Sequence, residues 1–379
     1  MVPMKRRLLS GAIAALAILT TASTASPQQL AGRWSAERAN AWQQQAGWLV
    51  GSNYAPASAI NQLEMWQAET WDPQAVDREL GWAQGLGFNT MRVFLHDLAY
   101  RQDPQGFLSR VDQFLAIASR HGIRPMLVLF DAVWDPFPRA GRQHQPVPGL
   151  HNSGWVQGPG AEILRDSARW GELLEPYVRG VVGRFANDRR VLAWDLFNEP
   201  DNANGGSYGA LDLTNKGEMS MALLRRTFGW ARAVNPTQPL TAAPWKGDWV
   251  DPSQTAPITQ FMLDNSDVIT FHSYEPVPTL QRQVPALKRL GRPVICTEYM
   301  ARPRGSTFEA VLPYFKEQQV GGINWGFVSG KSQTIYPWDS WEHRYPAEPP
   351  VWFHDIFRAD GTPYRAGEVA LIRSLTGRG

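Results

Sequence analysis

Short apolar segments alternate with longer segments of helical periodicity along almost the whole chain. The apolar segments are rich in β-branched residues, and eight can be counted: residues 48–54, 89–95, 124–130, 191–197, 239–243, 268–274, 293–298 and 322–328. A strand followed by a helix, repeated many times, builds a parallel sheet covered by helices. Eight such units predict the α/β class and, within it, a (β/α)8 TIM barrel.

Helical periodicity occurs between these segments, at residues 73–86, 106–121, 167–186, 216–234, 258–264, 279–290, 307–318 and 367–376. Within 167–186, three- and four-residue spacing produces one apolar face, made of Trp170, Leu173, Leu174, Tyr177, Val178, Val181 and Val182. Gly87, Gly122 and Gly291 directly follow predicted helices, as is typical of helix ends. We expect the apolar face of each helix to lie on the sheet.

The first 26 residues differ from the rest of the chain. Lys5, Arg6 and Arg7 precede an apolar run over residues 8–19, and small residues follow it. This order predicts a secretory signal peptide at residues 1–26, with an uncleaved anchor as the alternative. We therefore expect a secreted or periplasmic protein with no integral membrane span after cleavage. Residues 27–379 contain no linker or repeat and are predicted to form one domain.

Composition restricts the partners of the protein. The formal net charge is +2 and the basic residues are scattered, which argues against binding to nucleic acid. The 17 tryptophans exceed what packing requires, and their faces are suited to stacking on sugar rings. Cys296 is the one cysteine and lies in an apolar segment, which predicts a buried thiol and no internal disulfide. We expect a monomer that binds an uncharged carbohydrate.

Two glutamates stand at the ends of predicted strands, where barrel enzymes place their reacting side chains. Glu199 ends the fourth strand and is followed by Pro200, and Glu298 ends the seventh. Barrel closure brings strands four and seven to the same mouth. Cleavage of a glycoside needs two carboxyl groups, about 5–5.5 Å apart for retention of the anomeric configuration and about 6.5–9.5 Å apart for inversion. The sequence leaves both outcomes open.

The order of polar residues at the strand ends resembles that of glycoside hydrolase family 5, the cellulase-like family of the clan A retaining glycosidases. The residues that carry the resemblance are Arg92 at strand two, Asn198-Glu199-Pro200 at strand four, His272-Ser273-Tyr274 at strand six, Glu298 at strand seven and Trp325 at strand eight. The resemblance spans essentially the whole mature chain. It implies a catalytic domain over residues 27–379 that acts through a covalent glycosyl-enzyme intermediate, with Glu199 as acid/base and Glu298 as nucleophile.

The resemblance also implies roles for the neighbouring residues. Arg92 and Tyr274 would hydrogen-bond Glu298 and keep it ionised, while Asn198 would hold the sugar 2-hydroxyl. His272 would orient Glu199, and Trp325 would form an apolar floor under the sugar. We expect the nearby carboxylate to raise the pKa of Glu199, so that this group starts protonated.

One departure concerns the end of strand three, where the family commonly carries a histidine and this chain carries Asp131. We expect Asp131 to replace that contact with the sugar and His96 to fill part of the space. Trp134 and other loop tryptophans, namely Trp155, Trp245, Trp249, Trp338 and Trp341, are candidates for outer sugar subsites. Long loops at residues 131–166 and 329–360 would lie on the same face.

Other interpretations of these residues are open from the sequence. A glutamate, arginine, histidine or tyrosine at a strand end can serve a structural ion pair or hydrogen bond, and Trp325 can fill the core. The spacing of His and Cys predicts no metal site, and no Ser or Cys nucleophile or phosphate loop occurs, so we expect no cofactor. We expect a retaining hydrolase of a β-linked oligo- or polysaccharide of the β-glucan, mannan or xylan type; the alternatives are a transglycosylase and a non-catalytic carbohydrate-binding barrel.

Overall fold

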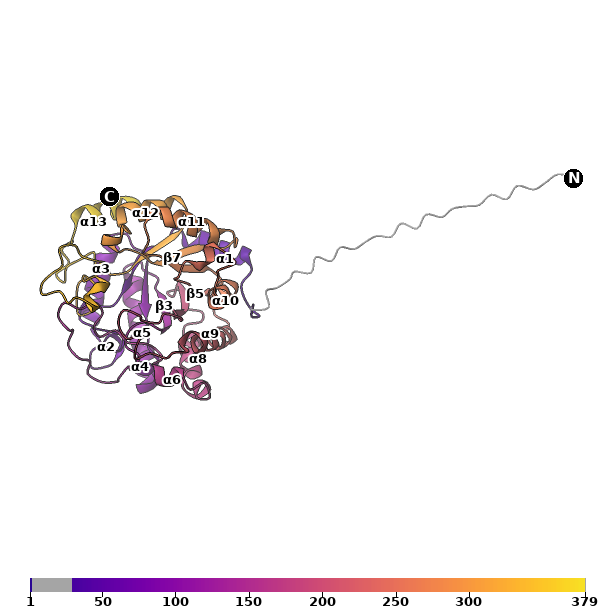
Figure 1. The fold of residues 1–379 in the computed structure, drawn as a ribbon, viewed down its shortest axis with the longest axis horizontal. Coiled ribbons are helices and arrows are strands. Elements are labelled where there is room, and N and C mark those ends of the chain that lie inside the picture. The colour runs from indigo at the N-terminus through magenta and orange to yellow at the C-terminus, as the bar shows by residue number, and fades with distance from the viewer. Residues whose placement is uncertain (2–28, 379) are drawn as a thin grey trace.

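The computed structural model describes Met1 and residues 29–378, so the predicted signal peptide lies, apart from Met1, outside the described residues. One sheet of parallel strands has the order β5-β4-β3-β2-β1-β8-β7-β6. Helices surround these strands in Figure 1. The strands are β1 Val50–Tyr54, β2 Thr90–Phe94, β3 Met126–Asp131, β4 Ala193–Asn198, β5 Leu240–Ala243, β6 Ile269–His272, β7 Val294–Glu298 and β8 Gly321–Asn324.

Contacts between β5 and β6 close the sheet into a barrel. Thr241 Oγ1 lies 2.8 Å from the carbonyl oxygen of Val268 and 2.7 Å from Thr270 Oγ1. The predicted (β/α)8 barrel is therefore confirmed, and each predicted strand overlaps an observed one. Strand β8 ends at Asn324 rather than at the predicted residue 328, because Gly326 adopts a φ of 84° and turns the chain away from the sheet.

The helices overlap all eight predicted segments. They are α1 Ala36–Ala46, α2 Gln62–Trp66, α3 Pro73–Gly85, α4 Asp97–Gln102, α5 Pro104–Arg120, α6 Ala161–Leu164, α7 Trp170–Leu173, α8 Glu175–Arg184, α9 Lys216–Ala233, α10 Pro257–Asn265, α11 Val277–Lys288, α12 Phe308–Glu317 and α13 Ala366–Thr376. The continuous helix predicted at 167–186 is wrong, because α7 and α8 are separate. Pro176 lies in the first turn of α8 and has no N–H to extend the preceding hydrogen-bond ladder.

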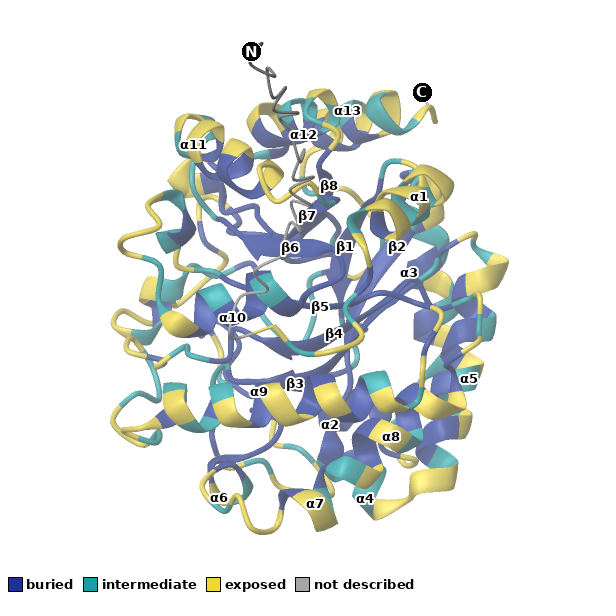
Figure 2. Ribbon diagram, turned by 90° about the vertical axis from the view of Figure 1, so that its right-hand side faces the viewer, coloured by how far each residue is buried: buried dark blue, intermediate teal, exposed yellow. Residues whose placement is uncertain are grey.

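Apolar residues pack the helices against the sheet and close one end of the barrel. Figure 2 shows buried strands inside helices that are buried inward and exposed outward. A separate cluster at the N-terminal ends of the strands consists of Trp34, Ala39, Leu49, Met126, Leu192, Ala193, Val268, Ile295 and Ile323. Because this end is plugged, ligands must enter at the C-terminal end. Cys296 is buried as predicted. Among residues 29–378, no helix is both long and apolar enough to cross a membrane.

Two long segments meet at the C-terminal end of the barrel, which is where the sequence predicts them. The first follows β3 and covers residues 132–160; the second follows β8 and covers residues 325–365. The amide of Asn152 donates to the carbonyl of Ser332 at 2.9 Å, and Gln333 Nε2 donates to the carbonyls of Val147 and Leu150 at 2.7 and 2.9 Å. These contacts join the two segments directly.

A buried ion pair holds the second segment to the barrel. Arg302 lies just after β7 and makes two bonds to Glu368 of α13, Nε to Oε1 at 2.7 Å and Nη2 to Oε2 at 2.6 Å. The same guanidinium donates to the carbonyls of Trp352 and Asp355, both in the second segment. Both charged side chains are 1% exposed. A buried cation in such a position depends on its carboxylate partner.

Replacing Glu368 by Ala leaves the buried Arg302 without its counter-charge. We expect Glu368→Ala to lower the free energy of unfolding by about 3–5 kcal/mol. The control is Glu175→Ala, which removes the exposed pair of Glu175 with Arg179 on α8 and should cost less than about 1 kcal/mol. Urea unfolding followed by circular dichroism compares the two variants, and equal losses of stability would contradict this account.

Candidate active site

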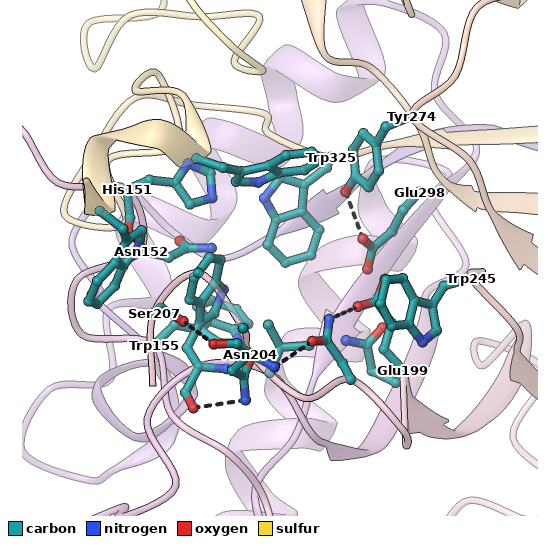
Figure 3. Close-up of a pocket in the computed structure, with 18 residues that line it drawn as sticks. His151, Asn152, Trp155, Glu199, Asn204, Ser207, Trp245, Tyr274, Glu298 and Trp325 are labelled. Atoms are coloured by element: carbon teal, nitrogen blue, oxygen red, sulfur yellow. Dashed lines mark hydrogen bonds between the residues drawn. The ribbon is translucent and has the colours of Figure 1, made fainter. Parts of the chain in front are cut away.

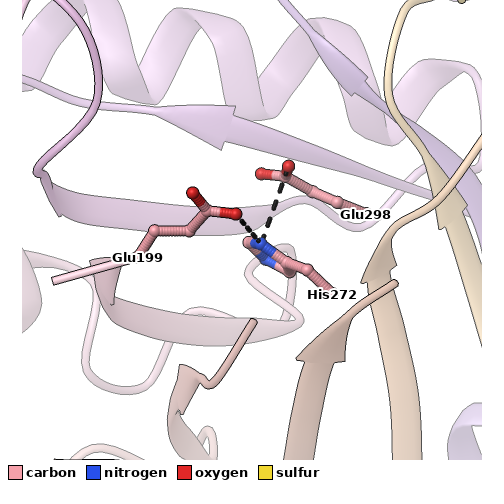
Figure 4. A group of neighbouring side chains, drawn as sticks. All are labelled: Glu199, His272 and Glu298. Atoms are coloured by element: carbon pink, nitrogen blue, oxygen red, sulfur yellow. Dashed lines mark hydrogen bonds and ion pairs between the residues drawn. The ribbon is translucent and has the colours of Figure 1, made fainter. Parts of the chain in front are cut away.

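Glu199 and Glu298 come together at the open end of the barrel. Glu298 is the last residue of β7, and Glu199 directly follows β4. One carboxylate oxygen of each, together with a ring nitrogen of His272, forms a group whose atoms all lie within 4.8 Å of one another (Figure 4). Carboxylate oxygens this close fit the short separation of retaining glycosidases better than the longer separation of inverting enzymes.

Glu298 is held by two donors on its two oxygens. Arg92 Nη1 donates to Oε1 at 2.8 Å, and the Tyr274 hydroxyl donates to Oε2 at 2.7 Å, as shown for Tyr274 in Figure 3. Burial raises the pKa of Glu298, and the positive charge of Arg92 and the hydrogen bond from Tyr274 oppose that rise. Both contacts expected for this carboxylate are therefore present. They favour its ionised form and fix its direction.

Arg92 joins Glu298 to the fourth strand. Its buried guanidinium forms an ion pair with Asp195 at 2.8 Å and donates from Nη2 to Asn198 Oδ1 at 2.7 Å. A further bond from Nη1 reaches Asn53 Oδ1 at 2.8 Å. Arg92 therefore forms a structural ion pair with Asp195 and also binds Glu298. One planar guanidinium can do both because its several N–H groups point toward β1, β4 and β7.

Glu199 occupies a strained backbone conformation and a buried position. Its φ is 41°, in the left-handed region that residues other than glycine rarely adopt. Burial raises the pKa of its carboxyl group to about 7; Asn202, which donates to Oε2 at 2.6 Å, lowers it, and the charge of Asp201 raises it. From the sequence we expected the neighbouring carboxylate to raise the pKa of Glu199. That expectation is wrong, because burial of the carboxyl group is the main cause of the raised pKa.

His272 connects the two glutamates. Its Nδ1 lies 2.8 Å from Glu199 Oε1 and 3.6 Å from Glu298 Oε2. Burial lowers the pKa of His272 to about 4, so the ring is neutral near neutral pH. A neutral ring whose Nδ1 faces Glu199 orients that carboxyl group. It adds no positive charge, which would lower the pKa of Glu199.

Asn198 is positioned from both ends of its amide. Its Oδ1 accepts from Arg92, and its Nδ2 donates to Asp131 Oδ1 at 2.9 Å. Asp131 also accepts from Trp155 Nε1 at 2.7 Å and Gln62 Nε2 at 3.1 Å, and burial raises its pKa to about 6. Asp131 thus lies behind Asn198 and is not among the residues that line the pocket.

His96 is also placed away from the pocket. It caps α4 by accepting from the amide of Leu98 at 3.1 Å, and its Nε2 lies 2.9 Å from the carbonyl oxygen of Gln157. The ring is fully buried. Neither His96 nor Asp131 lines the cavity, because His96 is bonded to Leu98 and Gln157, and Asp131 to Asn198, Trp155 and Gln62. The contact with sugar that was expected of them would have to come from other residues.

The cavity beside the glutamates has a volume of about 280 Å³ and a largely aromatic wall (Figure 3). Of the predicted residues, Asn198, Glu199, Tyr274, Glu298, Trp325 and Trp134 line it, as do the loop tryptophans Trp155, Trp245, Trp338 and Trp341. Trp249 does not line it and is buried. Trp134 stacks on Trp341 with centroids 5.5 Å apart and an interplanar angle of 10°.

Several lining residues were missed from the sequence: His151, Asn152, Val133, Asn202, Asn204, Gly205, Gly206 and Ser207. The last five follow Glu199 closely in a stretch rich in Asn and Gly, which is a usable signal for a functional loop. His151 and Asn152 carry no such signal, since only the contact between two distant segments brings them to the cavity.

The cluster of Glu199, His272 and Glu298 is the one group of potential metal ligands close enough to hold an ion among the described residues. The guanidinium of Arg92 lies 2.8 Å from Glu298 and provides the positive charge at this carboxylate. A divalent cation beside it would meet strong repulsion. The donor set therefore suits proton transfer and nucleophilic attack better than metal binding.

A family model described as cellulase (glycosyl hydrolase family 5) matches residues 56–330 of the chain. Mannan endo-1,4-beta-mannosidase A of Emericella nidulans is 28% identical over 93 residues, which make up 24% of this chain and 22% of that enzyme. The chain thus matches only about a fifth of the length of this curated relative.

Solved structures agree with the fold. A GH5_18 protein from Streptomyces cattleya has a TM-score of 0.57 at 16% identity, over 86% of this chain and 79% of that chain. An exo-beta-1,4-mannosidase from Opitutaceae bacterium strain TAV5 has a TM-score of 0.57 at 20% identity, over 88% of this chain and 60% of that chain. Similarity at such low identity supports the barrel alone. The family model, which spans more than half of the sequence, shows that this chain belongs to glycosyl hydrolase family 5.

Proposed function

We propose that the protein is a retaining β-glycosidase that hydrolyses β-mannosidic linkages. The observation that carries the proposed chemistry is the pair Glu199 and Glu298, with carboxylate oxygens within 4.8 Å of each other and different hydrogen-bond partners. A non-catalytic binding barrel would need neither the strained acid nor the paired nucleophile. Transglycosylation would use the same residues with a sugar in place of water.

In the first step, Glu298 attacks the anomeric carbon while Glu199 gives its proton to the departing oxygen. The bond from the anomeric carbon to that oxygen breaks as the bond to a Glu298 oxygen forms. Arg92 and Tyr274 orient the nucleophile, and the raised pKa of Glu199 supplies the proton near neutral pH. Asn198, fixed by Arg92 and Asp131, is placed to hold the sugar 2-hydroxyl.

In the second step, Glu199 takes a proton from water, and the oxygen of that water attacks the anomeric carbon. The ester bond to Glu298 breaks, and the sugar leaves with its original β configuration. Esterification removes the negative charge of Glu298, so that the pKa of Glu199 falls and the group now acts as a base. His272, a neutral ring whose Nδ1 lies 2.8 Å from Glu199 Oε1, would orient this carboxyl group in both steps.

The mannosidic substrate is supported by the names of the similar proteins. These include the mannan endo-1,4-beta-mannosidase of Emericella nidulans, the exo-beta-1,4-mannosidase of Opitutaceae bacterium strain TAV5 and a beta-1,4-D-mannanase from Cryptopygus antarcticus. The cavity supplies aromatic faces and amide groups, which suit an uncharged sugar. The signal-like residues 1–26 support export of the enzyme to the periplasm or medium.

Substitution of Glu298 tests its role as the nucleophile. We expect Glu298→Gln to lower kcat/KM on 4-nitrophenyl β-mannoside by about 10⁴-fold or more, because no nucleophile remains. Glu309→Gln, an exposed residue at the start of α12, is the matched control and should keep normal activity. Near-normal turnover by Glu298→Gln with an unchanged circular dichroism spectrum would contradict the assignment.

The loss of activity caused by Glu199→Ala should depend on the leaving group of the substrate. We expect a loss of about 10²–10⁴-fold on substrates with a poor leaving group, because these need general acid catalysis. A dinitrophenyl β-mannoside, whose leaving group needs no proton, should still release its phenol in a burst. Azide, a nucleophile that needs no base, should then restore turnover and yield a β-mannosyl azide. Equal losses on both substrates, without rescue, would count against Glu199 as the acid/base.

The pH profile should report Glu199. Activity requires this carboxyl group to be protonated, so kcat/KM should fall as the pH rises through about 7. Asn202→Ala removes a hydrogen bond to the charged form and should move the alkaline limb to higher pH. Asp201→Asn removes a negative charge and should move it to lower pH. Shifts of the same sign in both variants would show that another group controls this limb.

A comparison of 4-nitrophenyl β-mannoside, β-glucoside and β-xyloside tests the choice of sugar. We expect kcat/KM to be highest for the mannoside, by about 10-fold or more, since one misplaced hydroxyl contact costs at least this much in a fixed site. Release of nitrophenol measured by absorbance gives the ratios. A preference for the glucoside or xyloside would replace mannan by the corresponding β-glycan.

A further inference from the structure

We infer that the enzyme acts from the chain end: it removes one sugar at a time from the non-reducing terminus, because the cavity next to the glutamates is closed beyond the first sugar. This inference rests on the proposed function and adds the mode of attack. It is carried by the segment of residues 147–156, here called the wall, which crosses the mouth of the barrel after β3.

The wall is part of the packed protein. Residues 149–161 are all buried, although they belong to a long connection at the rim of the barrel. The amide of His151 donates to Ser340 Oγ at 3.0 Å, and its carbonyl accepts from Trp341 Nε1 at 3.0 Å. Gly149 approaches Tyr345 so closely that an added Cβ would lie 1.8 Å from the Tyr345 carbonyl oxygen. These close contacts hold residues 149–151 of the wall in one position against the second segment.

The opposite side of the wall is fastened to the start of α2. Asn61 Nδ2 donates to the carbonyl of Gly154 at 2.8 Å, and Gln62 Nε2 donates to the carbonyl of Val156 at 3.0 Å. The second segment is tied to the same region, since the amide of Lys331 donates to the carbonyl of Ala57 at 3.0 Å. The wall is therefore bonded both to the segment that follows β8 and to the start of α2, which follows β1.

The cavities on the two sides of the wall differ in size. Beyond Asn152, Trp155 and Trp325, which border both, lies a second cavity of about 30 Å³, lined by residues of β1, β2 and the segment after β8. A cavity of that size has room for a few water molecules at most, and a sugar ring does not fit. No residue of β1 or β2 lines the cavity beside the glutamates.

The cavity beside the glutamates continues into open space past Glu199, on the side away from the wall. Glu199, Trp245, Tyr274 and Trp338 border both the cavity beside the glutamates and a larger hollow of about 630 Å³ between the ends of β5 and β6. Because Glu199 protonates the departing oxygen, the leaving group extends into this hollow. The rest of the substrate is therefore accommodated beyond the acid.

The far end of the bound sugar then faces the wall. In Figure 3, His151 and Asn152 lie across the cavity from Glu298 and Tyr274. A ring with its anomeric carbon at Glu298 points its opposite edge, which carries the 4-hydroxyl, toward that side. The edge-to-face contact of Tyr208 with Trp341, at 5.2 Å, connects the loop after β4 to the second segment and narrows the same side. A further sugar attached there would collide with the wall.

The test uses the full-length mature enzyme and two β-1,4-mannopentaoses labelled at the reducing end. One has a free non-reducing terminus, and the other carries a 4-O-methyl group there. We expect the free pentaose to yield mannose and labelled tetraose first, and the methylated one to react at least about 100-fold more slowly. Early appearance of labelled biose or triose, or equal rates for both pentaoses, would overturn the inference.

An aryl β-mannoside and the variant Glu298→Gln separate this inference from the proposed function. Turnover of the aryl mannoside together with internal cleavage of the pentaose would leave the proposed function intact and overturn only the mode of attack. Absence of turnover on every β-mannoside would overturn the proposed function and this inference with it. Glu298→Gln should release nothing from either pentaose, which excludes a contaminating enzyme.

Discussion

The buried guanidinium of Arg92 is the charge on which the open end of the barrel depends. It binds Asp195 and Glu298 as ion pairs and orients Asn198 and Asn53 through their side-chain oxygens. Removing a buried cation of this kind would leave two carboxylates unpaired, and a buried ion pair broken on one side costs several kcal/mol. Its contacts with β1, β4 and β7 join three strand ends of the barrel mouth to Glu298, the proposed nucleophile.

The different environments of the two glutamates follow from this arrangement. Glu298 has Arg92 and Tyr274 as donors, whereas Glu199 has Asn202 and a neutral His272 and lies in a buried, strained position. Burial thus raises the pKa of Glu199 to about 7 while a cation lies against Glu298. Two chemically identical groups can then serve as acid and nucleophile at the same pH.

The sequence predicts the barrel and the residues at its strand ends well. Alternation of apolar and helical segments depends on local spacing, and each strand end must point to the mouth once the sheet closes. Arg92, Asn198, His272, Tyr274 and Trp325 accordingly lie around the two glutamates.

The loops were predicted less well, for a physical reason. Asp131 and His96 are turned away from the cavity by partners such as Trp155 and Gln157, and local pattern does not reveal those contacts. His151 reaches the cavity through bonds to residues almost two hundred positions later in the chain. Long-range packing of this kind determines the shape of the cavity beside the glutamates.

The most direct test of the central claim is covalent trapping of the nucleophile. A 2-deoxy-2-fluoro-β-mannosyl fluoride slows both steps but keeps a good leaving group, so the glycosyl-enzyme should accumulate. Mass spectrometry of the digested protein locates the label. The account predicts one fluoromannosyl group on the peptide that contains Glu298. A label on the peptide containing Glu199, or turnover of the reagent with inversion and no label at all, would contradict it.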